Sequence, residues 1–209
     1  MNNATRTAVS ALGIYAVLLG ATHGYLEILQ GDSAPRAVLI NAIGPPCQPE
    51  VVWHACLPAM TIVPNFSAAG AVTILLSLVT LIWAVVFIRR RHGGLILMGL
   101  SVLMLLAGGG FIATFVGLIA GGAGTGLGTS PTSRKPRLPA PMQNVLANLW
   151  PWSLIAFLAW SLMQWLLGYF INQAMISISC ALLLFSYFAL PLLTVMTGIA
   201  HDTENAHDK

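Results

Sequence analysis

The chain has 209 residues, of which 57% are hydrophobic and only 7% are charged, and its formal net charge is +3. Soluble domains carry about 25% charged residues, so this composition excludes an ordinary water-soluble protein. The small positive charge does not indicate nucleic-acid binding, and we expect a lipid bilayer to be the main partner of the chain.

Four apolar runs are long enough to cross a membrane, and they cover residues 8–29, 66–88, 149–170 and 174–200. Runs of about 18 or more apolar residues are typical of transmembrane helices, and these runs lack the polar alternation of β-barrel strands. We therefore predict an all-α, polytopic integral membrane protein. Residues 1–209 are expected to form one helical bundle in a bacterial cytoplasmic (inner) membrane. The first run is too long for a signal-peptide core and has no cleavage motif, so we expect it to stay as a helix.

The first apolar run carries its polar residues on one face. A helix turns about 100° per residue, which places Ala16, Gly20 and Gly24 on the same stripe as His23 and Glu27. Small residues spaced four apart let helices approach closely, so this stripe should face the bundle. His23 and Glu27 are therefore predicted to be buried in protein near the outer end of the run.

The pair formed by His23 and Glu27 allows three interpretations. The two side chains could form a structural hydrogen-bonded pair that fastens the following loop to the helix. They could form a ligand or proton site, because ionisable groups inside a membrane are usually functional. They could also bind one metal cation, with Glu50 or His54 from the loop completing the ligand set.

Residues 30–65 form a long loop with six prolines and several apolar stretches. Long loops without secondary structure are uncommon unless they are functional, so we expect this loop to fold over the helix ends as an extracytoplasmic lid. It contains Cys47 and Cys56, for which a disulfide bond is the first expectation on the oxidising side of the membrane. A redox-active thiol pair is the alternative.

The apolar run over residues 95–120 is interrupted by Gly108-Gly109-Gly110. It is either a fifth span or a re-entrant hairpin of two half-helices that turn at the glycines. The hairpin places eight of the nine basic residues on one side of the membrane, with only Arg36 opposite, whereas a fifth span divides them almost evenly. The positive-inside rule therefore favours four spans plus the hairpin, with both termini in the cytoplasm.

Residues 123–148 are rich in Gly, Ser and Pro and are predicted to be a flexible cytoplasmic linker. Asn172 and Gln173 mark a tight turn between the last two apolar runs. In the hairpin topology this turn lies on the same side of the membrane as the lid. The two polar side chains are therefore expected near the end of the first helix.

Together these patterns favour a non-enzymatic protein that binds or passes a small polar or cationic ligand, or a subunit of a larger membrane complex with a membrane-protein partner. The alternative is a membrane enzyme that uses a His/Glu metal site or the loop thiols. The sequence implies no particular cofactor. The predicted ligand-binding residues are His23, Glu27, Glu50, His54, Asn172 and Gln173.

Overall fold

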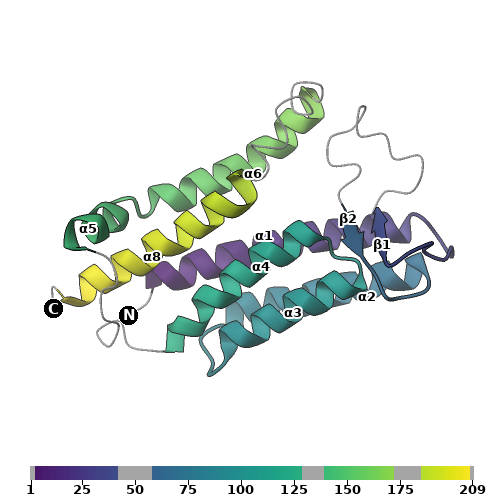
Figure 1. Cartoon of the computed structure of the whole chain (residues 1–209), viewed down its shortest axis with the longest axis horizontal. Coiled ribbons are helices and arrows are strands. Elements are labelled where there is room, and N and C mark those ends of the chain that lie inside the picture. Colours follow the sequence, from purple (N-terminus) through teal and green to yellow (C-terminus); the bar gives the residue numbers. More distant parts are fainter. Residues whose placement is uncertain (1–2, 42–57, 129–138, 172–184, 208–209) are drawn as a thin grey trace.

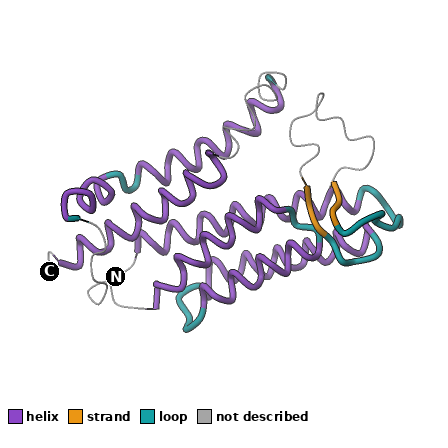
Figure 2. Tube along the Cα trace, viewed as in Figure 1, coloured by secondary structure: helices purple, strands orange, loops and turns teal. Residues whose placement is uncertain are grey.

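The computed structural model describes residues 3–41, 58–128, 139–171 and 185–207. The all-α prediction is confirmed, because the chain is mostly helical and its only sheet within these ranges has two short strands. Figure 2 shows the strands at one end of a bundle of long helices, and both chain termini lie at the other end.

The described elements follow one another along the chain in this order. The first helix α1 (Asn3–Ile28) leads to strands β1 (Leu39–Asn41) and β2 (Pro58–Met60), and α2 (Phe66–Ile82) then continues as the π-helical turn η1 (Trp83–Phe87). Helices α3 (Gly93–Ala107) and α4 (Phe111–Gly124) come next, followed by the 3-10 turn η2 (Thr125–Gly128). The last elements are α5 (Ala140–Asn148), α6 (Trp152–Phe170), the π-helical turn η4 (Phe185–Ala189) and α8 (Leu190–His207).

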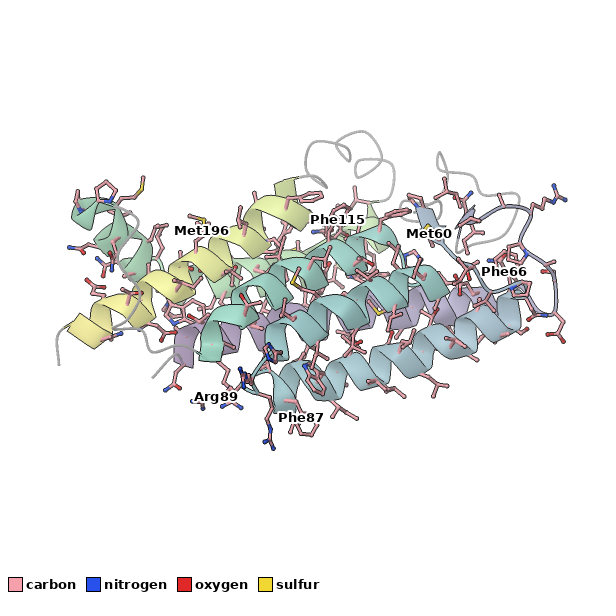
Figure 3. The ribbon with its side chains drawn as sticks, turned by 60° about the horizontal axis from the view of Figure 1, so that its bottom comes forward. Met60, Phe66, Phe87, Arg89, Phe115 and Met196 are labelled. Atoms are coloured by element: carbon pink, nitrogen blue, oxygen red, sulfur yellow. The ribbon has the colours of Figure 1, made fainter. Side chains whose placement is uncertain are left out.

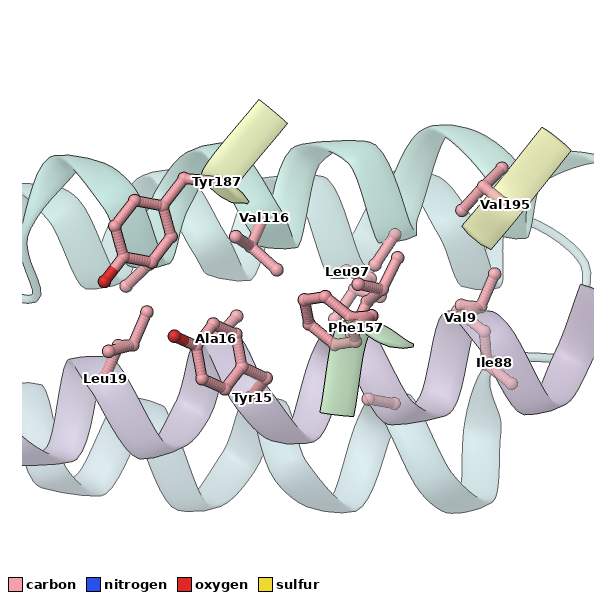
Figure 4. Packing of buried hydrophobic residues seen from close by; sticks show 14 of the residues in the cluster. Val9, Tyr15, Ala16, Leu19, Ile88, Leu97, Val116, Phe157, Tyr187 and Val195 are labelled. Carbon is pink, nitrogen blue, oxygen red and sulfur yellow. The ribbon is translucent and has the colours of Figure 1, made fainter. Parts of the chain in front are cut away.

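Helix α1 lies at the centre of the bundle and packs against α2, α4 and α8, as Figure 1 shows. Helices α3 and α4 pack on each other, and α8 packs against α5 and α6. In the core, Tyr15 of α1 meets Phe157 of α6 edge to face, with ring centroids 5.3 Å apart. Figure 4 shows this pair among the apolar side chains that α1 shares with its neighbours.

Two helices are long and apolar enough to cross a membrane, namely Asn3–Ile28 and Phe66–Phe87. The pair Pro141–Asn148 and Trp152–Leu167 would add a third if it forms one span, although the two helices are bent by 48°. The predicted run 174–200 lies partly outside the described residues. Helix α2 exposes many large apolar side chains, which is the surface expected of a helix in contact with lipid; they include Val72, Leu75, Leu78, Val79 and Ile82.

The segment predicted as a flexible linker is shorter than residues 123–148. Helix α4 and η2 continue to Gly128, and α5 occupies Ala140–Asn148. The sequence 140–148 has a proline in its first turn, where a missing backbone N–H breaks no helical hydrogen bond. The linker prediction therefore applies only to the stretch between η2 and α5.

Candidate functional site

The glycine triplet divides the apolar run 95–120 into two helices. Helix α3 ends at Ala107 and α4 begins at Phe111, and the φ angles of Gly108 and Gly110 are 134° and 81°. Residues with a side chain rarely adopt these angles, so glycine is required at both positions. At the far end of the two helices the backbones of Gly94 and Thr125 are in close contact. The run is therefore an antiparallel helical hairpin, and a single continuous helix over 95–120 is excluded.

His23 and Glu27 lie directly against the turn of this hairpin, here called the glycine tip (Gly108–Gly110). A Cβ atom at Gly108 would collide with both carboxyl oxygens of Glu27. A Cβ atom at Gly110 would lie 2.6 Å from Nε2 of His23. The glycines thus serve two purposes, because they allow the turn and also leave room for the polar side chains of α1.

Both polar side chains are buried, as the stripe on α1 predicts. Glu27 is 0% exposed and His23 is 8% exposed. The two carboxyl oxygens of Glu27 have no hydrogen-bond partner among the described residues, and the same is true of Nδ1 of His23. No hydrogen bond joins the two side chains, but residues 42–57 of the loop lie outside the described ranges, so the structural interpretation stays a prediction. Buried polar groups are nearly always hydrogen-bonded, so we expect a partner at this site from residues outside these ranges, from water or from a bound cation or proton.

The segment after β2 in the loop 30–65 binds the end of α3, next to the glycine tip. Strands β1 and β2 pair antiparallel, with Ile40 opposite Ala59. After β2, the hydroxyl of Thr61 donates to the carbonyl oxygen of Ala107 at 3.0 Å, and the amide of Ile62 donates to the carbonyl oxygen of Leu106 at 2.9 Å. The last carbonyls of a helix have no partner within it, so the loop caps the end of α3 next to the site.

Sequence reasoning did not identify the two glycines that border the site, nor a buried threonine that packs beside Gly24. Gly108 and Gly110 were recognised as a turn but not as the wall opposite Glu27 and His23. Thr73 of α2 is fully buried beside Gly24, and its hydroxyl has no partner in the described part of the chain. A threonine within an apolar helix gives no signal of its own, because such hydroxyls usually bond to their own backbone.

The remaining predicted site residues lie outside the described residues. These are Glu50, His54, Asn172 and Gln173, and the same holds for Cys47 and Cys56. The disulfide and the contribution of these side chains to the site therefore stay predictions. Within the ranges that the structure describes, no three His, Cys, Asp or Glu side chains form a metal-binding group. Glu50 and His54, the further metal ligands suggested by the sequence, lie outside these ranges, so the metal interpretation stays a prediction.

Comparison with protein-family models, with curated proteins and with solved structures finds no match for this chain.

Proposed function

We propose that this chain is a multi-pass protein of a bacterial cytoplasmic membrane that binds or passes a small cation at Glu27 and His23. The observation that carries the proposal is the buried Glu27 carboxyl group, which faces the glycine tip with no hydrogen-bond partner among the described residues. Ionisable residues inside membrane helices are costly to insert and commonly mark the path of an ion or a proton.

The chemistry of the unpartnered atoms supports a cationic ligand. The two oxygens of a carboxylate only accept hydrogen bonds, and an unprotonated imidazole nitrogen is also an acceptor. The backbone of Gly108 is already in contact with the Glu27 carboxyl group, so a large ligand would have to displace the glycine tip. The proton is the first candidate because it needs no cavity.

The arrangement of charges supports the proposed orientation in the membrane. Arg6 and the cluster Arg89–Arg91 belong to the end of the bundle that holds the termini, and Figure 3 shows Arg89 far from Met60 and Phe66. Arg36 belongs to the opposite end, before β1. Positive residues mark the cytoplasmic side, so the termini would be cytoplasmic and the sheet extracytoplasmic.

Proton flux into liposomes tests the proposal. Purified protein is reconstituted with a pH-sensitive dye inside, and a potassium diffusion potential is applied with valinomycin. We expect the wild-type protein to acidify the interior and Glu27→Gln to slow this at least tenfold, with a smaller loss in His23→Ala. Glu204→Gln and His201→Ala, both in α8, are matched controls that should keep the wild-type rate.

A wild-type rate of proton flux in Glu27→Gln would refute the proposal that the cation passes at Glu27. If the wild-type protein passes no protons, calorimetric titration of the purified protein with Na⁺ and with ammonium tests two further small monovalent cations. No binding of either cation to the wild-type protein would refute the cation proposal and favour a subunit of a membrane complex.

A further inference from the structure

We infer that the loop after β2 is a latch on the end of α3, next to the glycine tip, and that its release opens Glu27 to water from the sheet end of the bundle. The inference names the regulation of the site described above, so its purpose rests on the proposed function. Its structural content does not, because access to a carboxyl group can be measured without any transport.

The latch consists of two hydrogen bonds from neighbouring residues. The Thr61 hydroxyl donates to Ala107 and the Ile62 amide donates to Leu106, at 3.0 and 2.9 Å. Thr61 is also tied to the sheet, because its own amide donates to the carbonyl oxygen of Val38 at 2.9 Å. Thr61 is only 2% exposed, so these bonds are shielded from water while the latch is closed.

The latched residue is a direct neighbour of the residue that covers the site. Ala107 accepts the bond from Thr61, and Gly108, which follows it, contacts the Glu27 carboxyl group. One peptide unit therefore separates the carbonyl group that the latch binds, in Ala107, from the residue that covers Glu27, Gly108. Glycine adopts backbone angles that residues with a side chain rarely adopt, so Gly108 and Gly109 are suited to act as a hinge.

Gly110 and the far end of the hairpin are held by contacts that do not involve the latch. The hydroxyl of Thr114 donates to the carbonyl oxygen of Gly110 at 3.1 Å, which fixes the start of α4. At the other end of the hairpin, Gly94 packs against the backbone around Thr125. Release of the latch should therefore displace Gly108 and Gly109 and expose Glu27, while His23 stays covered by Gly110.

The test measures the rate at which Glu27 is modified. The purified protein is treated with a water-soluble carbodiimide and glycine ethyl ester, and the fraction of Glu27 converted to the amide is followed by mass spectrometry. Thr61→Val removes the hydroxyl donor at nearly constant volume, and we expect it to raise the modification rate at least threefold. Thr61→Ser keeps a hydroxyl and should restore a slow rate.

Thr125→Val is the matched control. The Thr125 hydroxyl also donates to a backbone carbonyl, that of Gly122 at 2.6 Å, but at the opposite end of the hairpin. This variant should leave the modification rate at Glu27 unchanged. Equal rates in Thr61→Val and the wild-type protein would overturn the latch, and so would an equal increase in Thr125→Val.

Hydrogen exchange of the wild-type protein provides a measurement that depends on no variant. The Ile62 amide bonds to Leu106 and the Gly109 amide bonds to Met104 at 2.7 Å, so opening of the latch and tip together should expose both with the same protection factor. Protection factors that differ more than tenfold would overturn the inference. Normal flux in Glu27→Gln together with faster modification in Thr61→Val would refute the proposed function but leave the latch intact.

Discussion

The carboxyl group of Glu27 lies where the side chain of residue 108 would begin. The two residues are far apart in the sequence, and each explains the other. Gly108 must lack a side chain because Glu27 fills the space beside it, and Glu27 is buried because the tip of the α3–α4 hairpin covers it. This contact joins the polar stripe of α1 to the break in the apolar run 95–120.

Gly108→Ala should destabilise the protein by at least about 2 kcal/mol, because the new Cβ collides with Glu27 and the backbone is held at a positive φ. Unfolding in mixed detergent micelles, followed by circular dichroism, measures the loss. In a Glu27→Ala background only the backbone strain remains, so the same substitution should cost about 1 kcal/mol less.

Gly99→Ala is the control for this prediction. Gly99 lies in the same helix α3, and a Cβ atom there meets nothing within 4 Å. Alanine is favoured over glycine within a helix by about 1 kcal/mol, so this variant should be as stable as the wild-type protein or more so. A similar loss in both variants would contradict the specific contact between Gly108 and Glu27.

The hairpin predicts which single cysteines a membrane-impermeant thiol reagent reaches from the same side of the membrane. In a cysteine-free background, single cysteines at Arg90 and Thr125 should react from one side of oriented vesicles. A cysteine at Ser33 should react from the other side. All three positions are exposed, and Gly94 and Thr125 are in contact at one end of the hairpin. Reaction of the cysteines at positions 90 and 125 from opposite sides would contradict the proposed membrane topology.

Asp202 of α8 caps the N-terminus of α1, because its carboxylate accepts hydrogen bonds from the amides of Ala4 at 3.1 Å and Thr5 at 2.8 Å. Loss of a helix cap costs about 1–2 kcal/mol. Asp202→Ala should therefore lower the free energy of unfolding by about this amount. Asp202→Asn should lower the free energy of unfolding by less, since the amide oxygen of asparagine still accepts one hydrogen bond. Glu204→Ala, in the same helix, should be close to the wild-type protein, and equal losses at both positions would argue against the cap.

The position of the polar stripe could be predicted from the sequence because it depends only on helical periodicity. Gly20, His23, Gly24 and Glu27 are all buried, as their spacing on one face of α1 requires. The break at the glycine triplet was also visible, since three glycines disfavour a helix interior and the distribution of basic residues favoured a reversal there. Neither inference depends on how the neighbouring helices pack.

The partner of the stripe could not be predicted in the same way. Nothing in the spacing of His23 and Glu27 selects the glycine tip over the loop residues Glu50 and His54, because the choice depends on how helices pack. Strands β1 and β2 have three residues each, too few for a recognisable alternation. Helix α5 was missed because prolines and glycines around it indicated a linker.

The contact between α6 and α8 includes a hydroxyl pair whose energy can be measured directly. The hydroxyls of Ser153 and Thr197 are 2.6 Å apart, and both residues are buried. Interhelical hydrogen bonds in membrane proteins contribute about 0.6 kcal/mol on average. A double-mutant cycle of Ser153→Ala and Thr197→Val should therefore give a favourable coupling energy of about this size.

In the control cycle, Thr203→Val replaces Thr197→Val. Thr203 lies in the same helix but bonds to the carbonyl oxygen of Ile199, so its effect should add to that of Ser153→Ala without coupling. A coupling energy of zero for Ser153 and Thr197, or an equal one in the control cycle, would show that this hydrogen bond does not hold α6 against α8.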